Sequence, residues 1–499
     1  MTLDKLLSFD WGMMAPEFSI VITAILLSLI DLFMPNKVSR KPLALLGLAG
    51  IIVAIVFAVL QVGDPVGSIL FDTYRFDSFA LAFKLLFLVA TAMIFLLALD
   101  FEGESKWAYR GEFYYLLMTA LLGAMMMASS ADLITLFVGL ELLSISSYIL
   151  AGIRKRNFHS NEAAFKYVVN GGIATAITLF GMSYIYGLTG QTNLYAISEM
   201  LVDPRVQENS FLVIMAFVMM FVGLSFKISA APFHMWAPDV YQGSPTPVTT
   251  FLSVVSKMAG FTLILRLFFV IFLGTQGWHN QILLDAQPFI AFVAGATMVI
   301  GNVVALRQRN IKRMFAYSSI AHAGYVLVPF VSLSLIVFKT TWFYLLAYLL
   351  MNIGAFAVIQ FVTSREKSED FTAFSGLNKR APLTAFMMAI FIISLAGLPF
   401  TAGFIGKFGI FMSSLGTGHY ILASVMIATT VVSYVYYFNV MVQIYFRKGA
   451  GNRIRPTAGL AVVMVICTIG TLLFGIYPSL ALDFFQSGFD INDLFTPSE

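Results

Sequence analysis

The chain has 499 residues, of which 59% are hydrophobic and only 11% charged, and its mean hydropathy is +0.87. Water-soluble globular domains carry about 25% charged residues, so this composition excludes that class and predicts a membrane protein. The formal net charge of +4 is small and the basic residues fall in short clusters, which argues against a nucleic-acid partner. The single Cys467 excludes a disulfide framework and any cysteine-based metal or iron–sulfur site supplied by this chain alone.

The N-terminal stretch lacks the features of a secretory signal. It carries Asp4, Asp10 and Glu17 against a single base, Lys5, and no small-residue cleavage pattern follows. A signal peptide has a positively charged start and a cleavage site of small residues. We therefore expect this stretch to belong to the mature protein.

Hydrophobic stretches long enough to cross a bilayer follow one another along almost the whole chain. A spanning helix needs about 20 mostly apolar residues, and on this basis we predict an all-α polytopic membrane protein with about 14 transmembrane helices. The predicted spans are 16–34, 42–62, 76–100, 112–130, 131–152, 162–187, 210–242, 244–273, 288–306, 311–332, 336–363, 381–414, 420–446 and 457–478.

The loops between these spans alternate between basic and neutral, as the positive-inside rule requires. Every second loop is basic, and these loops hold 20 of the 30 Lys and Arg residues. The alternation predicts an even number of spans, basic loops in the cytoplasm and both termini outside. The basic loops contain Lys37, Arg40, Lys41; Lys106, Arg110; Arg154, Lys155, Arg156; Arg307, Arg309, Lys312, Arg313; Arg365, Lys367, Lys379, Arg380; and Arg447, Lys448, Arg453, Arg455.

Two predicted spans place an ionisable residue near their centre. A charge at mid-bilayer costs roughly 2.5 to 3.5 kcal/mol even on insertion scales, so each one needs a reason. Glu141 is ten residues past Ala131 and cannot reach the interface, and Lys257 is equally deep in its span. Both residues fit a proton relay. Lysine suits this role because a buried lysine can become neutral, whereas arginine stays charged. The alternative is a structural ion pair between buried charges.

Spans 210–242 and 381–414 are too long for one helix, since each would run about 50 Å against a hydrocarbon core of roughly 30 Å. Lys227 lies in the first and Lys407 in the second. Proline removes a backbone donor and glycine tolerates irregular backbone, so we predict that both helices are broken. The interrupting residues are Pro232 and Pro238 in the first span, and Gly397, Pro399, Gly403 and Gly406 in the second.

A matching pair of interrupted spans is typical of transporters built from inverted repeats. We therefore predict a single membrane domain, 1–499, with two inverted five-helix repeats, spans 4–8 and 9–13, in which broken helix 7 matches broken helix 12. Lys227 precedes its prolines whereas Lys407 follows its own, so these lysines should not be strictly equivalent. The segments are an N-terminal three-helix part (1–111), the first repeat (112–273), the second repeat (288–446) and a C-terminal helix (457–478).

Several further polar residues lie within or beside the spans. His322 can titrate near neutral pH, although a lone histidine among small residues is as often a hydrogen-bonded packing residue. His234 adjoins the first break, and Ser144 and Tyr148 follow Glu141 on the same helix, where they can order water. His234, Ser144 and Tyr148 are weaker candidates for the same route than His322.

Three other basic residues lie in spans but near an end. Lys166 and Arg266 can extend their charged groups to the interface, and we expect them to act chiefly as interfacial anchors, with a functional role as the alternative. Lys84 can also reach the outer surface, which leaves its role open. The chain shows no phosphate-binding glycine loop, metal-ligand pair or nucleophile elbow, so no covalent catalysis and no metal site are expected.

Five ordered stretches resemble the antiporter-like membrane subunits of respiratory complex I, which are related to subunits of cation/proton antiporters and membrane-bound hydrogenases. Tyr-Gln-Gly-Ser-Pro-Thr-Pro and the lysine at 407, where the M-type subunit has glutamate, make the chain most similar to the N-type subunit, and it lacks the long lateral helix of the L-type. The stretches are Phe-Val-Gly-Leu-Glu-Leu-Leu-Ser, Asn-Glu-Ala-Ala-Phe-Lys-Tyr (161–167), residues 227–247, residues 311–325 and Leu-Ala-Gly-Leu-Pro-Phe-Thr-Ala-Gly-Phe-Ile-Gly-Lys-Phe.

The resemblance implies roles for the intramembrane residues. Glu141 and Lys227 match the pair at the start of the family's channel, Lys257 the central lysine and Lys407 the terminal lysine near the outlet. His322 matches a histidine of the polar axis. The implied function is proton movement from the cytoplasm to the outside, driven by redox chemistry in other subunits.

The resemblance also implies partners and location. No cofactor belongs to this subunit, because NADH, FMN, iron–sulfur clusters and quinone are used in other subunits of the complex. The implied neighbours are an M-type subunit on one side and small K- and J-type subunits on the other, in a bacterial cytoplasmic (inner) membrane. Two alternatives stay open: a subunit of a sodium/proton antiporter without a redox partner, and a scaffold that conducts nothing.

Overall fold

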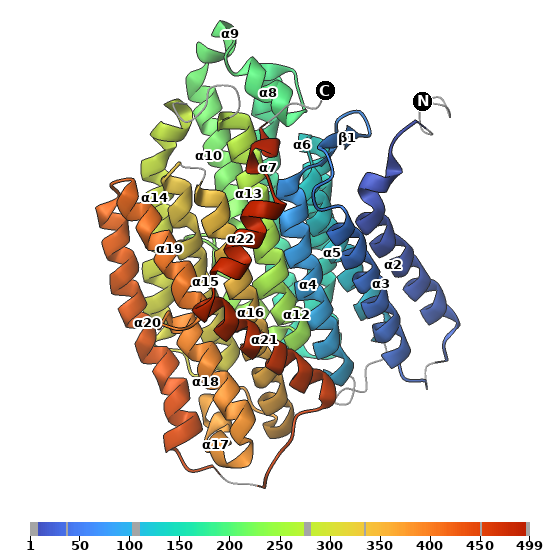
Figure 1. Cartoon of the computed structure of the whole chain (residues 1–499), viewed down its shortest axis with the longest axis vertical. Coiled ribbons are helices and arrows are strands. Elements are labelled where there is room, and N and C mark those ends of the chain that lie inside the picture. The colour runs from blue at the N-terminus through green and yellow to red at the C-terminus, as the bar shows by residue number, and fades with distance from the viewer. Residues whose placement is uncertain are drawn as a thin grey trace.

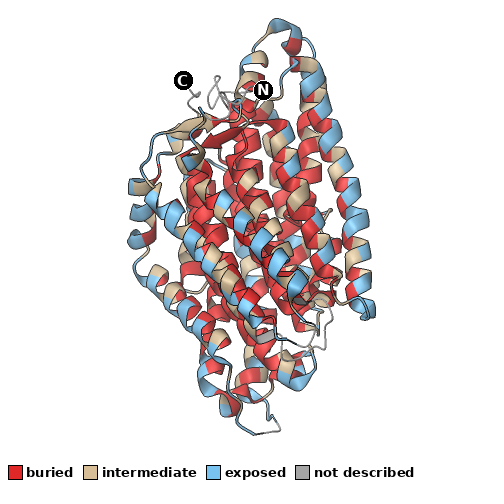
Figure 2. Ribbon diagram, turned by 90° about the vertical axis from the view of Figure 1, so that its right-hand side faces the viewer, coloured by how far each residue is buried: buried red, intermediate tan, exposed pale blue. Residues whose placement is uncertain are grey.

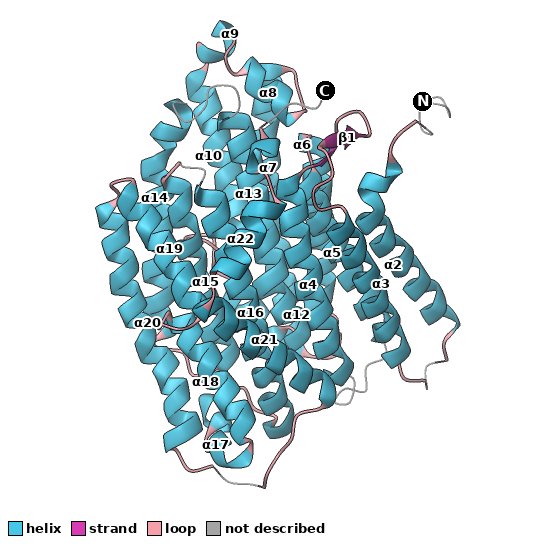
Figure 3. Ribbon diagram, in the orientation of Figure 1, coloured by secondary structure: helices cyan, strands magenta, loops and turns pink. Residues whose placement is uncertain are grey.

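The computed structural model describes residues 8–35, 38–101, 110–273, 281–333, 336–449 and 452–495. Most of these residues are helical, and Figure 3 shows one small hairpin among the helices. The fold class is thus all-α and polytopic, as predicted. The expectations for Asp4, Lys5, Lys37 and Lys106 lie outside the described residues.

Thirteen helices of the described part are long and apolar enough to cross a membrane. They are α2 (Ala15–Phe33, continuous with η1, Trp11–Met14), α3 (Lys41–Leu60), α4 (Ser78–Phe101), α5 (Arg110–Ser129), α6 (Leu133–Ala151), α7 (Phe158–Thr189), α10 (Ser210–Lys227), the continuous unit α12 (Thr246–Phe251), η3 (Leu252–Ser256) and α13 (Lys257–Leu273), α14 (Gln281–Ala305), α15 (Ile311–Val331), α16 (Ile336–Glu366), α20 (Tyr420–Phe446) and α21 (Ala458–Ile476).

The predicted span 381–414 accounts for the fourteenth crossing. It is divided into α18 (Pro382–Ala396) and α19 (Ala402–Gly416), each of 15 residues. Neither half is long enough alone for a hydrocarbon core of about 30 Å, so the pair crosses together. The remaining short helices are α8 (Leu194–Met200), α9 (Pro204–Gln207), α11 (Trp236–Gly243), η5 (Phe371–Phe374), α17 (Leu377–Arg380), α22 (Ser479–Gly488) and η6 (Ile491–Leu494).

The helices stand side by side in one bundle, with α2 and α3 at one edge and α20 at the other (Figure 1). The segments nearest the two termini, η1 and η6, lie at the same end as α8 and α9, whereas α17 and the last turns of α20 lie at the opposite end (Figure 1). The chain therefore crosses the bundle an even number of times between η1 and η6.

A two-stranded hairpin lies at the end that holds the termini. Strand β1 (Gly67–Ile69) pairs antiparallel with β2 (Tyr74–Phe76), with Ser68 opposite Arg75. Span prediction missed this hairpin because three-residue strands have no hydrophobic periodicity to detect.

Burial divides the bundle into an inner and an outer set of helices. In an apolar stretch of 18 residues within 246–273, every residue is buried. The buried share of such a stretch is 94% in α15 and in α16, but only 33% in α2, α3 and α7. Figure 2 shows the exposed residues on outward faces of the helices. Many of these are large and apolar, such as Leu60 and Phe180, as expected where a helix faces lipid. The central helices are therefore the ones whose polar side chains need partners inside the protein.

Candidate functional site

The first predicted break follows Lys227, the last residue of α10. Residues 228–235 form turns, with a positive φ at Ser229 and a cis peptide bond between Ala231 and Pro232, before α11 begins. The indole Nε1 of Trp236 donates to the carbonyl of Phe226 at 3.0 Å and so provides a donor for the end of α10. The predicted discontinuity is confirmed.

Lys227 is buried and points toward α6. Its Nζ donates to the hydroxyl of Ser144 at 3.0 Å. Glu141 lies one turn before Ser144, is half-buried, and accepts a hydrogen bond from the hydroxyl of Thr175 at 2.8 Å. Glu141 and Lys227 make no direct ion pair in this structure, although the charge of Glu141 acts on Lys227. Ser144, and not Glu141, is therefore the hydrogen-bond partner of the Lys227 ammonium.

Lys257 begins α13 directly after the π-helical turn η3. Such turns occur often at functional sites, because they displace side chains from the regular helical register. Nζ of Lys257 donates to the carbonyl of Ser319 at 2.6 Å and also to its hydroxyl. The hydroxyl of Ser319 accepts from Tyr348 at 2.9 Å and lies 3.3 Å from the hydroxyl of Tyr241. Polar groups of α11, α15 and α16 thus meet at Ser319, which accepts from Lys257.

His322 is buried one turn further along α15. Its Nδ1 lies 2.5 Å from the hydroxyl of Tyr344 and its Nε2 lies 3.1 Å from the hydroxyl of Tyr437. The hydroxyl of Tyr437 also bonds to Ser318. Both ring nitrogens therefore have a hydroxyl partner that can donate or accept, which is the arrangement a proton relay needs.

The second break separates α18 from α19. α18 ends at Ala396, and Gly397 follows with φ +81°, a left-handed conformation that glycine adopts without steric cost. Nζ of Lys407, on α19, reaches back to the carbonyls of Leu395 and Ala396 at 2.8 and 3.1 Å. These carbonyls end α18 and carry the negative end of its dipole, so they attract a positive charge.

Packing joins these residues into one series. Lys227 lies against Gly260, which follows Lys257 by three residues in α13. A Cβ added at Gly260 would lie 3.2 Å from Cγ of Lys227. At the other end, Nζ of Lys407 lies 4.9 Å from the centre of the Tyr325 ring, three residues after His322. Four candidates therefore lie on or beside α13 and α15 in the interior of the bundle, namely Lys227, Lys257, His322 and Lys407.

Three weaker candidates lie around the first break and not along α13 and α15. Tyr148 packs edge to face against Tyr167, with ring centres 4.7 Å apart. His234 lies in the turn before α11, and its Nδ1 has no hydrogen-bond partner in the described structure. Lys166 is 39% exposed, and its Nζ is 2.7 Å from Glu162 and 2.6 Å from Asp239.

Sequence reasoning missed the hydroxyl groups that connect the charged residues, above all Ser319, Tyr344, Tyr348 and Tyr437. A weak signal was present in α15, where Ser318, Ser319, His322 and Tyr325 recur at three- to four-residue spacing in an otherwise small and apolar stretch. That spacing places polar groups on one helical face.

The expectation that Arg266 extends to the interface is wrong. Its side chain is fully buried, and Nη2 donates to both carboxylate oxygens of Asp77 at 2.7 Å. Burial without snorkelling is possible because the Asp77 carboxylate balances the guanidinium charge inside the protein. Lys84 is also buried, with its Nζ 2.6 Å from Glu17.

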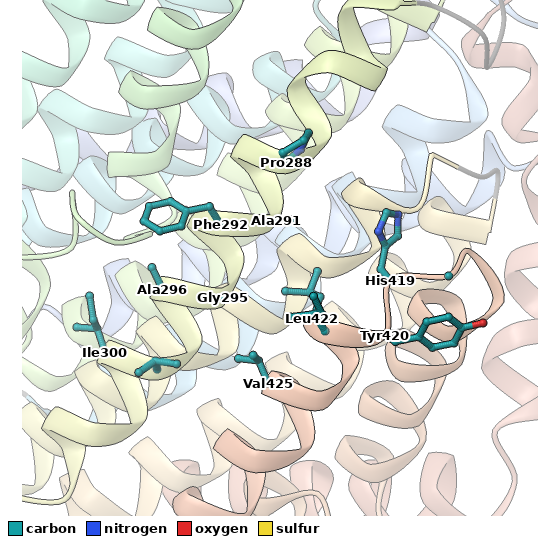
Figure 4. Close-up of a pocket in the computed structure, with 13 residues that line it drawn as sticks. Pro288, Ala291, Phe292, Gly295, Ala296, Ile300, His419, Tyr420, Leu422 and Val425 are labelled. Atoms are coloured by element: carbon teal, nitrogen blue, oxygen red, sulfur yellow. The ribbon is translucent and has the colours of Figure 1, made fainter.

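One cavity of the described part lies away from the buried lysines. A cavity of about 870 Å³ between α14 and α20 is lined mainly by apolar residues such as Phe292 and Leu422, with His419 and Tyr420 at one end (Figure 4). It contains none of the buried lysines. Within the described residues, no group of three or more His, Cys, Asp or Glu side chains is placed to hold a metal ion.

A polytopic bundle with two broken helices and buried lysines beside them defines a class of ion-translocating membrane subunits. Residues 130–433 match the family described as NADH:quinone oxidoreductase/Mrp antiporter, transmembrane. The chain belongs to this family.

Its relatives include proteins named NADH-quinone oxidoreductase subunit N. The one from Geobacillus sp. (strain WCH70) is 57% identical over 97% of this chain and 100% of the relative, and the one from Bacillus anthracis is 50% identical over 98% of both. A chain of respiratory complex I from Thermus thermophilus, solved with bound aureothin, is 31% identical with a TM-score of 0.79, covering 95% of this chain and 100% of that one. A chain of the Mrp complex from Dietzia sp. DQ12-45-1b is similar in fold, with 20% identity, a TM-score of 0.81 and coverage of 99% and 100%.

Proposed function

We propose that this chain is the N-type, proton-translocating membrane subunit of a bacterial NADH:quinone oxidoreductase. The observation that carries the proposal is the buried series Lys227, Lys257, His322 and Lys407, in which each member has a polar partner that can exchange a proton or stabilise its charge. Such groups are costly in a bilayer and persist where they serve transport.

In the proposed route protons enter from the cytoplasm and pass along Lys227, Lys257 and His322 to Lys407, from which they leave to the outside. Hydroxyl groups fill the intervals, since Ser319 contacts Lys257 and the tyrosines 344 and 437 contact His322. Movement of Glu141 toward or away from Lys227 changes how strongly the ammonium form is held, because opposite charges favour each other's ionised forms. This movement gives the redox subunits a means to drive transport.

The proposal includes the arrangement of the chain and its surroundings. Two inverted repeats, 112–273 and 288–446, each contain one broken helix, and the similar packing of α5 on α6 and of α14 on α15 supports this division. The chain binds no redox cofactor of its own. It lies in the cytoplasmic membrane with both termini outside, between an M-type subunit and the small K- and J-type subunits.

A sodium/proton antiporter without a redox partner is the less supported function. Identity to subunit N proteins reaches 57% over the whole chain, whereas identity to the Mrp chain is 20%. Co-purification with redox subunits in mild detergent distinguishes the two.

The test is Lys257→Met in the assembled complex reconstituted into vesicles, with protons pumped per NADH oxidised as the readout. We expect the ratio to fall by the share that this subunit carries. Lys41→Met, at an exposed lysine of α3, is the matched control and leaves the ratio unchanged. An unchanged ratio in the Lys257 variant overturns the proposed route.

A further inference from the structure

Lys312 is a buried cation that the proposed route does not use. The sequence assigns it to a basic loop, yet its side chain is only 2% exposed at the start of α15. Its Nζ lies 2.8 Å from Oε1 of Glu369 and donates to the carbonyl of Ser244 at 3.2 Å. The Glu369 side chain is 30% exposed, so this pair connects the surface of the basic-loop end with the interior.

The position of Glu369 is fixed by its own backbone and a neighbouring amide. The amide of Ile311 donates to the carbonyl of Glu369 at 2.8 Å, and Nδ2 of Asn310 donates to Oε2 of its carboxylate at 3.0 Å. A further backbone bond joins Phe371 to Arg309 at 3.1 Å. The carboxylate is therefore held against Lys312 by ordered structure and not by a flexible side chain alone.

One face of α15 leads inward from this pair. Lys312 and Ser319 are seven residues apart, which is about two turns or 10.5 Å on the same side of a helix. Ser319 is the residue whose carbonyl and hydroxyl accept from Lys257. Lys312 and Ser319, the residue that binds the central Lys257, thus share one face of α15.

Hydroxyl groups of α11 and the following residue lie beside this face. The hydroxyl of Tyr241 is 3.3 Å from that of Ser319. The hydroxyl of Ser244 is buried and has no hydrogen-bond partner in the described structure, although the carbonyl of the same residue accepts from Lys312. Buried hydroxyls are usually partnered, and a free one can both donate and accept a proton.

The charged neighbours separate Lys312 from the other basic residues of the same end. Arg313, the next residue, turns aside to Asp239 at 2.5 Å and Gln242 at 3.1 Å. Arg154 acts on Lys312 from the loop after α6, and Glu369 is the acid that faces it. Arginine cannot release its proton in a protein. Of Lys312, Arg313 and Arg154, Lys312 is therefore the base that can pass on a proton.

We propose that Glu369 and Lys312 form a second proton-uptake site, which joins the proposed route at Lys257 along α15, in addition to the entry through Lys227. The inference rests on the proposed function. Glu369 takes a proton from water on the basic-loop side, which the positive-inside rule assigns to the cytoplasm. The Lys312 ammonium gives its proton inward through the hydroxyls of Ser244, Tyr241 and Ser319 to the neutral amine of Lys257. The neutral Lys312 then takes the proton from Glu369, which returns the site to its starting charges.

The test uses the complete complex in vesicles whose NADH-accessible face is outward, so that the outer buffer is the cytoplasmic side. Lys312→Arg keeps the positive charge and its ion pair with Glu369 but cannot release a proton. We expect protons pumped per NADH to fall, but by less than in Lys257→Met, because the entry through Lys227 remains. Arg313→Lys, a charge-conserving change at the adjacent position, is the matched control and keeps the full ratio.

Glu369→Gln supplies an independent readout on a partly exposed residue. We expect its ratio to fall at alkaline outer pH and to recover at acidic outer pH, because uptake then depends on direct protonation of Lys312 from water. A Lys312→Arg complex that pumps normally, or a Glu369→Gln defect that is equal at every pH, overturns the uptake site. If Lys312→Arg does not assemble, the pH profile of Glu369→Gln decides alone. A normal ratio in Lys257→Met contradicts the proposed function instead, so the two failures are distinguishable.

Discussion

The two broken helices use opposite means to satisfy the end of their first half. At the first break, the neutral indole of Trp236 donates to the carbonyl of Phe226, and Lys227 is left to face Ser144 and Glu141. At the second break, Lys407 itself donates to the final carbonyls of α18.

This difference shows that the two lysines are not interchangeable copies. An acidic side chain acts on Lys227, whereas the Lys407 ammonium donates to backbone carbonyls and lies over the Tyr325 ring. An acid on a neighbouring helix can move and change its influence, while the carbonyls at a helix end are fixed by the backbone. The first break is thus suited to regulation and the second to holding a charge in place.

The largest expected effect on proton transport is at the acid that distinguishes the first break. Glu141→Gln removes the charge that acts on Lys227 but keeps an oxygen that can accept from Thr175. We expect roughly a tenfold loss of proton transfer through this subunit, equivalent to about 1.4 kcal/mol. Protons pumped per NADH in reconstituted vesicles measure it. A normal ratio would show that Lys227 needs no acidic partner, and the contrast between the breaks would lose its functional meaning.

The broken helices were predictable because their causes are local. An overlong apolar stretch that contains Pro232, or Gly397 and Pro399, reads as a discontinuity from the sequence alone. The depth of Glu141 and Lys257 within their spans was predictable for the same reason, since it needs only a count of residues.

The partners of these residues were not predictable, because they come from distant parts of the chain. Arg266 is buried by Asp77, 189 residues earlier, and without that contact the sequence suggests an interfacial arginine. Ser319 is one of several serines in its span, and only the packing of α11, α13 and α16 on α15 selects it. Lys312 looked like a loop residue, because its burial depends on a loop that returns after α16.

The second prediction breaks the satisfied helix end at the first break. Trp236→Phe removes the indole donor to Phe226 and part of the ring stacked on Tyr167 at 4.4 Å. We expect a loss of about 1 to 3 kcal/mol of stability, seen as faster hydrogen exchange in 228–236, together with reduced pumping. Trp342→Phe removes an equally buried indole bond, to the carbonyl of Ala82 on α4, which belongs to neither broken helix. This control should destabilise without a comparable loss of pumping, and equal pumping losses in both variants would contradict a specific role for Trp236.

The matching change at the second break is Gly397→Ala. Gly397 has φ +81°, and its new Cβ would come 2.7 Å from Cδ of Lys407, so the lysine has to move from its carbonyl partners. We expect a destabilisation of about 1 to 2 kcal/mol from the left-handed backbone alone, measured by thermal unfolding of the complex. Gly416→Ala, at the end of the same helix α19, meets no atom within 4 Å and serves as the control. Equal stability of the two variants would show that the second break tolerates a side chain at its turn.

The smallest effect is expected where both breaks are left intact. Lys166 is 39% exposed, and its ion pairs with Glu162 and Asp239 lie in contact with water, where such pairs contribute about 0 to 1 kcal/mol. Lys166→Ala should therefore change stability by less than about 1 kcal/mol, and raised salt should reduce the difference further, since salt screens exposed charges. Pumping should stay close to that of the unchanged complex, because Lys227 keeps its contact with Ser144. A loss as large as that of Glu141→Gln would place Lys166 on the proton route and extend the regulated region of the first break to the surface.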